Sequence, residues 1–333
     1  MLENLALLAD EVLSHYDVTT ENKKVIQSGG IKTVWQLATP AGPACLKRLR
    51  KTEEEAVFSI SAQNYMAEKG AKVPAIIPAR NGKLYVNRGG EIFVLYEWVE
   101  GQAIHMDRRE DLARAVAGIA GFHRESAGYV PPDDCRVSSK LGRWPHYYES
   151  VKKRLLNWKT MAAASPADPT AKIFAEHVDF FVELAEQAQS LLAVSAYNEW
   201  VKEVEQKGNL CHQDYGDGNA LWTEEGIYVL DLDGVTYDLP ARDLRKIITK
   251  RMAKQGSWNL DLLHDITGWY TAVNPLTPEQ LKVLYIDILF PHQFHDTAKN
   301  PFLKQKPTKA SKIAEAVKLE KQKTELVLKL LAQ

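Results

Sequence analysis

The sequence is poor in cysteine and has no long apolar run. Only three of its 333 residues are cysteines, and Cys45, Cys135 and Cys211 stand far apart without a C-x-x-C pair. This spacing argues against a zinc site or a disulfide framework and fits a reducing compartment. No apolar stretch approaches the ~18 residues that a membrane-spanning helix requires, so we expect no membrane span.

An excess of charge of either sign is also missing. The 42 Lys and Arg residues nearly balance the 43 Asp and Glu residues, which leaves a net charge of −1. No global field therefore favours nucleic acid or a membrane surface as a partner. The first residues, Met1–Asn4, carry an acid instead of the basic start of a signal peptide. We expect a protein that is made and folded in the cytosol and binds neither nucleic acid nor membrane.

The first hundred residues alternate short strand-like runs with turn residues. Residues 2–13 are apolar at helical spacing, and 52–69 reads as a second helix with Thr52 as its N-cap and Gly70 as its stop. Gly and Pro clusters separate the strand-like runs 24–27, 33–38, 44–48, 75–79, 83–87 and 91–98. We expect five of these runs to form an antiparallel sheet with one helix inserted after its third strand.

After about residue 100 the pattern becomes helical. One clear strand pair, 220–222 with 227–230, interrupts a series of long helical stretches. These are the helix that includes 112–123 and the stretches near 145–163, 170–206, 241–254, 278–289 and 310–331. The pattern predicts a bilobal α+β protein with an N-terminal lobe of residues 1–100 and a helical lobe of residues 101–333. The lysine-rich segment 304–323 is expected to be a solvated helix face.

The segment 212–219 and the strand end at Asp231 carry the residue types of a phosphoryl-transfer site. Asp214 can accept the proton of an attacking hydroxyl, and Asn219 and Asp231 can hold a metal ion on ATP phosphates. Gly216 and Gly218 would permit the positive φ angles that such a loop often requires. Each piece alone is an ordinary polar turn, but the order and the strands between the pieces favour a catalytic site.

Two neighbours of these residues are ambiguous. His212 could be a base or a metal ligand, although hydrogen bonds that brace the loop are the favoured interpretation. Asp233, two residues after Asp231, could contact the metal or only lie near it.

Lys47 ends a predicted strand with apolar neighbours, as a lysine that contacts the α and β phosphates would. Such a lysine needs a carboxylate partner on the next helix. Glu53, Glu54 and Glu55 open that helix, and Glu55 fits best, with Glu54 as the alternative.

Two further segments complete the expected nucleotide site. Ser28–Ile31 contains Gly29 and Gly30 one strand before the lysine strand, which is a weak signal for a phosphate cradle because two glycines usually only turn a hairpin. The segment from Glu97 to Val99 joins the two expected lobes. Its backbone groups are expected to read the adenine edge.

Taken together, Lys47, the acidic helix, the joining segment, the H-x-D-x4-N loop and the D-x-D strand end resemble the aminoglycoside phosphotransferase and choline kinase group. Residues 210–216 and 229–245 are similar to the spore-coat CotS-type proteins within it. The resemblance implies a protein-kinase-like fold with ATP and Mg²⁺ between the lobes. It also implies synthesis in the mother-cell cytoplasm and location in the spore coat.

The resemblance leaves the acceptor open and places it in the second lobe. Residues 141–148, rich in aromatics and with Arg143 and His146, could line its pocket, although ordinary helix packing is the favoured interpretation. We expect an ATP- and Mg²⁺-dependent kinase for a hydroxyl on a small molecule or a coat component, with other coat proteins as partners. The alternatives are a structural coat protein that kept the fold without turnover, and a nucleotide sensor without transfer.

Overall fold

The computed structural model describes residues 2–29 and 32–332 and contains two compact units. Unit 1 comprises Met1–Ser139 and Lys207–Tyr237, and unit 2 comprises Lys140–Gln206 and Asp238–Gln333. The chain therefore does not divide into compact units at residue 100, where we expected the lobes to meet. The segment 207–237, which carries the candidate catalytic residues, folds with the N-terminal part of the chain.

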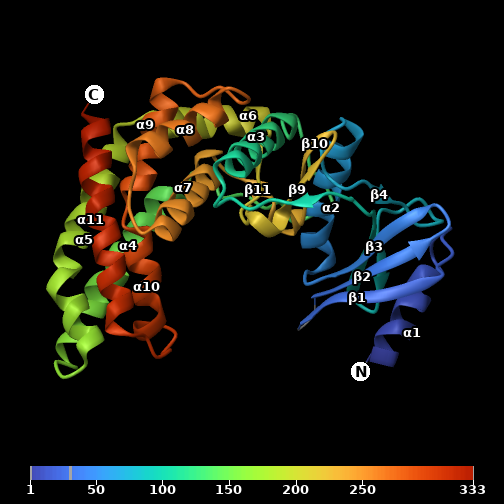
Figure 1. Ribbon diagram of the computed structural model, residues 1–333, viewed down its shortest axis with the longest axis horizontal. Helices are drawn as coiled ribbons and strands as arrows, with labels where there is room; N and C mark the ends of the chain where they lie inside the picture. Colours follow the sequence, from blue (N-terminus) through green and yellow to red (C-terminus); the bar gives the residue numbers. More distant parts are fainter. Residues whose placement is uncertain (1, 30–31, 333) are drawn as a thin grey trace. The chain divides into compact units, whose positions relative to one another are not determined.

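An antiparallel sheet forms the N-terminal part of unit 1 (Figure 1). In the described residues it has six strands, in the order β1-β2-β3-β6-β4 with β5 also on β6, which corrects the expected number of five. β4 and β5 pair with different segments of β6, so the sheet is still five positions wide. The strands are β1 (Asn22–Gly29), β2 (Lys32–Thr39), β3 (Gly42–Leu49), β4 (Ile76–Ile77), β5 (Val86–Arg88) and β6 (Glu91–Glu97).

Two apolar clusters pack on this sheet, one with each of the helices α1 (Leu2–Leu13) and α2 (Glu53–Glu68). β6 contributes to both clusters, since Phe93 and Leu95 belong to the α1 cluster and Val94 belongs to the α2 cluster. This alternation follows the two-residue period of a strand. It explains why residues 92–96 are an uninterrupted apolar run.

Helix α2 begins and ends as the sequence predicts. The Thr52 hydroxyl accepts a hydrogen bond from the Glu55 amide at 3.4 Å, and Gly70 has a φ of 79° just after the helix. An N-cap of this kind stabilises a helix by about 1 kcal/mol, and the left-handed glycine gives the chain a sharp exit.

Short strands frame the candidate catalytic segments in the rest of unit 1. The expected hairpin is present, with β9 (Ala220–Thr223) antiparallel to β10 (Gly226–Val229), and β7 (Gln102–Ala103) adds to it. β8 (Leu210–Cys211) pairs with β11 (Thr236–Tyr237). Because β8 precedes the 212–219 loop and β11 follows the 231–234 turn, this ladder joins both ends of the block. Helix α3 (Arg109–Glu125) packs on the hairpin.

Unit 2 is helical, and its expected helices near 145–163, 241–254, 278–289 and 310–331 are all present. The expected stretch 170–206 is two helices, and helices 260–271 and 292–302 were not expected. No described helix is long and apolar enough to cross a bilayer. The helices are α4 (Trp144–Ala163), α5 (Pro169–Ala193), α6 (Tyr197–Lys207), α7 (Ala241–Gln255), α8 (Leu260–Thr271), α9 (Pro278–Leu289), α10 (His292–Phe302) and α11 (Ala310–Leu331).

An aromatic cluster joins α5 and α10 in the core of unit 2. Phe294 stacks on Phe174 and Phe181 with ring centroids 5.2 and 4.0 Å apart, and all three rings are fully buried. Burial of one such ring contributes about 1.5–3 kcal/mol. These contacts fix α10 although its own sequence is largely polar.

The expectation that the lysine-rich segment 304–323 is a solvated helix face is wrong at the C-terminal end of the segment. Glu320 and Lys323 on α11 are 2% and 3% exposed and form a salt bridge. Glu320 accepts the backbone N–H groups of Gln293 and Phe294 at the start of α10, and Lys323 donates to the Phe290 carbonyl. A buried carboxylate at a helix N-terminus satisfies otherwise unpaired amides and interacts favourably with the helix dipole.

Candidate functional site

Lys47 and the pair Asp231 and Asp233 meet at the centre of unit 1. The Lys47 Nζ lies 2.7 Å from Asp231 Oδ1 and 2.6 Å from Asp233 Oδ1. Lys47 is only 7% exposed. Burial by itself would lower the pKa of this ammonium, but the two carboxylates outweigh burial and raise it. The lysine is therefore held charged beside two negative groups.

A second lysine completes this cluster. Lys32 Nζ lies 2.7 Å from Asp231 Oδ2 and 3.6 Å from Asp233 Oδ2. Burial would raise the pKa of the Asp231 carboxyl, but Lys47 and Lys32 hold it well below its usual range. Asp231 also has a φ of 61°, a left-handed conformation that non-glycine residues rarely adopt. The strained backbone conformation therefore occurs at Asp231, the residue whose carboxylate the two lysines keep charged.

Lys32 was not predicted, although the strand pattern contains a signal for it. Val34 pairs with Lys47 across the β2–β3 ladder. Residues two apart on a strand share a face, so Lys32 lies on the same face of the sheet as Val34. Lys32 could therefore have been predicted as a site residue, because it comes shortly after Gly29 and Gly30 and lies on the face of the sheet that carries the buried Lys47.

The 212–219 loop is held by His212, which is fully buried. Its Nε2 lies 2.8 Å from the Leu230 carbonyl oxygen, and its Nδ1 accepts the Asp214 amide at 3.3 Å. With the proton on Nε2, both bonds form at once and tie the loop to the end of β10. These are the contacts of a residue that braces the loop.

The left-handed residue of this loop is Gln213, with a φ of 72°. Gly216 is extended, with a φ of 179°, and Gly218 does not adopt a positive φ. The expectation that these two glycines supply the turn is therefore wrong. The turn is made one residue before Asp214, by Gln213, whose side chain is buried.

Asn219 connects Asp214 to the segment that follows β10 and leads to Asp231. Its Nδ2 donates to the Asp214 carbonyl at 2.8 Å, and its own carbonyl accepts the Leu230 amide at 3.0 Å. The Asp214 side chain is exposed, whereas the backbone on either side of it is fixed. The loop thus presents a carboxylate to solvent from a rigid support.

A cavity of about 390 Å³ contains Lys32, Lys47, Asn219 and Asp231 on its walls. Residues 97–99, the expected adenine-reading segment, also line it. The structure therefore brings the nucleotide-side and metal-side predictions into one cavity of unit 1. Burial raises the pKa of the Cys45 thiol in its wall to about 11, so this cysteine is a neutral thiol at pH 7.

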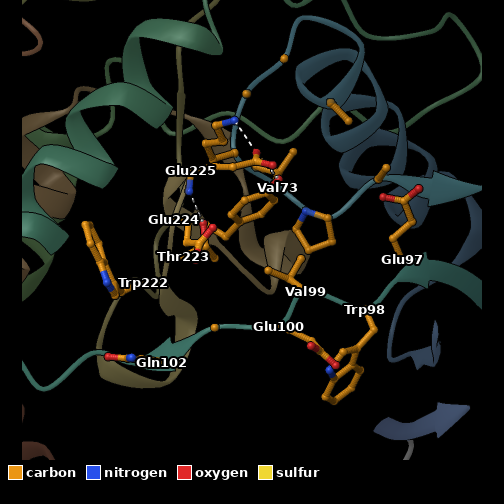
Figure 2. Close-up of a pocket in the computed structure, with 18 residues that line it drawn as sticks. Val73, Glu97, Trp98, Val99, Glu100, Gln102, Trp222, Thr223, Glu224 and Glu225 are labelled. Atoms are coloured by element: carbon orange, nitrogen blue, oxygen red, sulfur yellow. Dashed lines mark hydrogen bonds and ion pairs between the residues drawn. The ribbon is translucent and has the colours of Figure 1, made fainter. Parts of the chain in front are cut away.

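A larger cavity, of about 730 Å³, shares residues 97–99 with the first one. Figure 2 shows the side chains that line it. Its walls include the end of α2 and the β9–β10 turn, where Lys72 and Glu225 form a 2.8 Å salt bridge. It contains neither Lys47 nor Asp231. We assign the chemistry to the smaller cavity because Lys47, Lys32 and Asp231 line it.

The expected pair between Lys47 and Glu55 is absent. Glu55 binds Arg136 at 3.0 Å, Glu53 binds Tyr85 and Asn87, and Glu54 is exposed. These three acids occupy the first turn of α2, where their side chains are exposed or half-buried. The α2 residue in the wall of the Lys47 cavity is the amide Gln63. Asp231 and Asp233 take the role of partners to Lys47.

The glycine segment can be followed only in part. Gly29 ends β1 and pairs with Lys32, while Gly30 lies outside the described residues. The phosphate contacts expected of Gly29 and Gly30 therefore stay a prediction.

The aromatic stretch 141–148 belongs to unit 2. Trp144 and Tyr148 are buried in the helical core, as ordinary packing predicts. Arg143, His146 and Tyr147 are exposed at a cavity of that unit.

The donor set around Asp231 fits a divalent cation. Asp231 and Asp233 supply charged carboxylate oxygens, Asn219 supplies an amide, and all three lie on one connected loop system. Oxygen donors of this kind are the ligands that Mg²⁺ prefers. Two ammonium groups lie against the carboxylates, as expected where negative charge is concentrated.

Comparison with known proteins identifies the group to which this site belongs. The model of the family described as "Spore coat putative kinase YutH" matches residues 10–333. The chain belongs to this family. The chain is also similar to spore coat protein S of Bacillus subtilis, with 30% identity over 301 residues, which cover 90% of this chain and 86% of that protein.

Solved structures share the fold of this spore coat kinase family member. An aminoglycoside phosphotransferase from Alicyclobacillus acidocaldarius has a TM-score of 0.77 and 17% identity and covers 97% of this chain and 94% of its own. A spectinomycin phosphotransferase has a TM-score of 0.61 and 16% identity, with 97% of each chain covered. The predicted protein-kinase-like α+β fold is confirmed.

Proposed function

We propose that the protein is an ATP-dependent phosphotransferase that uses a divalent metal ion, Mg²⁺, and transfers the γ-phosphoryl group to a hydroxyl acceptor. One observation carries this proposal: the buried Lys47 ammonium contacts Asp231 and Asp233 together. A lysine and a metal-binding Asp side by side are the two charged parts that ATP phosphates require. A desolvated ion pair is a poor source of stability for a sheet, so the placement of these charges in a cavity wall supports a role in binding a charged ligand.

The cavity around Lys47 supports nucleotide binding. Its 390 Å³ volume lies in the range of small-molecule sites. The backbone N–H groups of Glu97 and Trp98 donate to the carbonyls of Ala75 and Pro43. The backbone of Val99 is then the group of this segment proposed to meet the adenine edge. The spectinomycin phosphotransferase of the same fold was solved in complex with ADP and spectinomycin.

The metal would be held by Asp231 and Asn219, with Asp233 close enough to share the charge. When bound, a divalent ion neutralises charge on the phosphates. Lys47 would bind and orient the phosphates, and Lys32 would add a second positive charge at the mouth of the cavity.

Asp214 is proposed to align the acceptor hydroxyl and to accept its proton as the new P–O bond forms and the bond between the γ-phosphorus and the leaving ADP oxygen breaks. Its carboxylate is exposed to an incoming acceptor, while His212 and Asn219 fix its backbone. A carboxylate in this position typically contributes about 10²- to 10⁴-fold to the rate.

The acceptor is proposed to be a small molecule or a component of the spore coat. The name of the relative from Bacillus subtilis, spore coat protein S, supports location in the coat and other coat proteins as partners. Against a purely structural role stands the intact set of Lys47, Asp214, Asn219 and Asp231, since a protein without turnover has no need of all four.

The test is a screen of hydroxyl acceptors and coat extracts with ATP labelled at the γ-phosphate. We expect transfer by the wild-type protein and a loss of about 10²-fold or more in Asp214→Asn, with ATP binding retained. Transfer that survives this substitution would refute the assignment of the base. ATP binding without transfer to any acceptor would favour the structural or sensor alternative.

A further inference from the structure

Unit 2 contains its own cavity, of about 450 Å³, between α4, α7 and the start of α10. Its walls carry five cationic side chains against two carboxylates. The cations are Lys140, Arg143, Arg154, Arg242 and Arg245, and the carboxylates are Asp238 and Asp287. All residues of its walls belong to unit 2. The volume is that of a small-molecule site.

The buried carboxylate of Asp287 is already satisfied by the protein. It accepts hydrogen bonds from Arg245 Nε at 2.7 Å, from the Tyr148 hydroxyl at 2.9 Å and from His292 Nε2 at 2.8 Å. Asp287 is only 2% exposed. Its negative charge is therefore balanced by Arg245 and is not offered to a ligand.

The second carboxylate, Asp238, is engaged in the same way. Its Oδ1 accepts the indole N–H of Trp144 at 3.3 Å and the amide of Leu239 at 2.9 Å, and the residue is 1% exposed. Neither acid in the wall can therefore bind a cationic ligand without breaking buried hydrogen bonds, which is costly.

The cations nearer the surface have no carboxylate of the described residues in direct contact. Among the residues that the structure describes, no carboxylate lies within ion-pair distance of the guanidinium groups of Arg143, Arg154 or Arg242. Arg143 and Arg154 are exposed and Arg242 is half-buried, so all three can reach a ligand. A guanidinium group donates two parallel hydrogen bonds to a phosphate or carboxylate, a geometry that suits these anions best.

One wall of the cavity is aromatic. Tyr147 is 38% exposed and stacks on His292 with ring centroids 5.9 Å apart and an interplanar angle of 17°. Its ring offers a flat surface to a ligand whose charged end lies at the arginines. Such a combination of apolar surface and a few charged groups fixes the orientation of a ligand.

We infer that this cavity is a binding site for a small organic anion, a phosphate monoester or a carboxylate attached to a flat or apolar group. Arg143 and Arg242 bind the anionic group, and Tyr147 contacts the remainder. The site does not depend on the proposed phosphotransfer, because its residues belong to unit 2 and need no nucleotide. An acidic wall for a polycationic ligand is absent from the described residues of this cavity.

The test uses phenyl phosphate as the probe, with benzoate as the carboxylate and phenol as the neutral control, in titration calorimetry of the full-length protein. The variant is Arg143→Gln/Arg242→Gln. The matched control is Lys250→Gln, which removes an exposed charge from α7 outside the cavity. Thermal unfolding of each variant checks that it is folded.

We expect phenyl phosphate to bind the wild-type protein and Lys250→Gln equally, and the double variant at least about tenfold more weakly, as the loss of charge-assisted hydrogen bonds implies. Benzoate that binds and responds in the same way identifies the carboxylate as an equal source of the anion, and a response of phenyl phosphate alone identifies the phosphate. Absence of binding to the wild-type protein would overturn the proposal. So would equal binding of phenol, or binding that the double variant leaves unchanged.

Discussion

Lys47 and Asp231 lie 184 positions apart in the chain, and the Lys47 Nζ is 2.7 Å from Asp231 Oδ1. The strand β3 supplies the lysine and the end of β10 leads to the aspartate. A buried lysine on one segment and a carboxylate with a strained backbone on another meet in a cavity that is also lined by residues 97–99, the segment proposed to contact the adenine edge. The proposed function depends on this contact more than on any other.

Replacement of Lys47 by Met should weaken ATP binding about 10- to 100-fold, because a charge-assisted contact with phosphate contributes about 1.5–3 kcal/mol. Titration calorimetry with ATP and Mg²⁺ measures this change. Lys83→Met, in an exposed turn of the same unit, is the control and should bind like the wild-type protein. Equal affinity of all three proteins would remove Lys47 from the nucleotide site.

Lys32→Gln should have a smaller effect, about 3- to 10-fold on ATP affinity. The Lys32 side chain is 28% exposed against 9% for Lys47, and solvent weakens an exposed charge. The same titration checks the order of the two variants. A loss as large as that of Lys47→Met would contradict the secondary position assigned to Lys32.

Glu55→Gln should leave ATP affinity unchanged and alter the free energy of unfolding by less than about 0.5 kcal/mol. Its partner is Arg136, and the two side chains are 40% and 70% exposed, a setting in which ion pairs contribute little. Calorimetry and urea unfolding measure both quantities. If ATP affinity falls by tenfold, Glu55 must pair with Lys47 once the nucleotide is bound.

Sequence patterns predicted the elements whose periodicity is strong. The strands around Lys47, the cap at Thr52 and the hairpin before Asp231 follow from local chemistry, and each is present. Helix α10 was missed because its sequence is largely polar and contains Pro301. Its place is fixed by tertiary contacts, the Phe294 stack and the Glu320 cap, which a local pattern does not contain.

The candidate site was predicted in its residue types but not in its pairings. Spacing indicated Asp214, Asn219 and Asp231, whereas the partner of Lys47 depends on how the chain folds back. Glu55 was chosen on one helix, and the structure instead brings Asp231 and Asp233 from a distant turn. Gln213 was missed as the left-handed residue because glycine is the usual choice there.

The pH dependence of the stability of unit 2 should be set in part by His292. Burial and the nearby Arg245 lower the pKa of His292 to about 4 from an ordinary 6.5. Between pH 6.5 and pH 4, His292 is protonated in the unfolded chain and neutral in the folded protein. The contribution of this histidine to stability is therefore fully present above pH 6.5 and is lost as the pH falls toward 4. The loss should reach about 2.5 kcal/mol at pH 4.5.

His292→Gln tests this expectation by removing the titration while keeping a donor for Asp287. Urea unfolding at pH 7 and pH 4.5 should show a smaller difference in the variant than in the wild-type protein. The pKa of Asp287 is also held low, by Arg245 and His292 against the effect of burial, so its own contribution is lost only at more acidic pH. His146→Gln, at an exposed position of α4, is the control. Identical pH dependence of the wild-type protein and His292→Gln would contradict the account.

The most direct test of the proposed function is the melting temperature with and without ATP and Mg²⁺, in the wild-type protein and in Asp231→Asn. A ligand at 100 times its Kd stabilises the native state by about 2.7 kcal/mol. We predict a clear rise for the wild-type protein, dependent on the metal, and none for Asp231→Asn. A wild-type protein whose melting temperature does not change at millimolar ATP and Mg²⁺ would contradict the assignment of this cavity to a nucleotide.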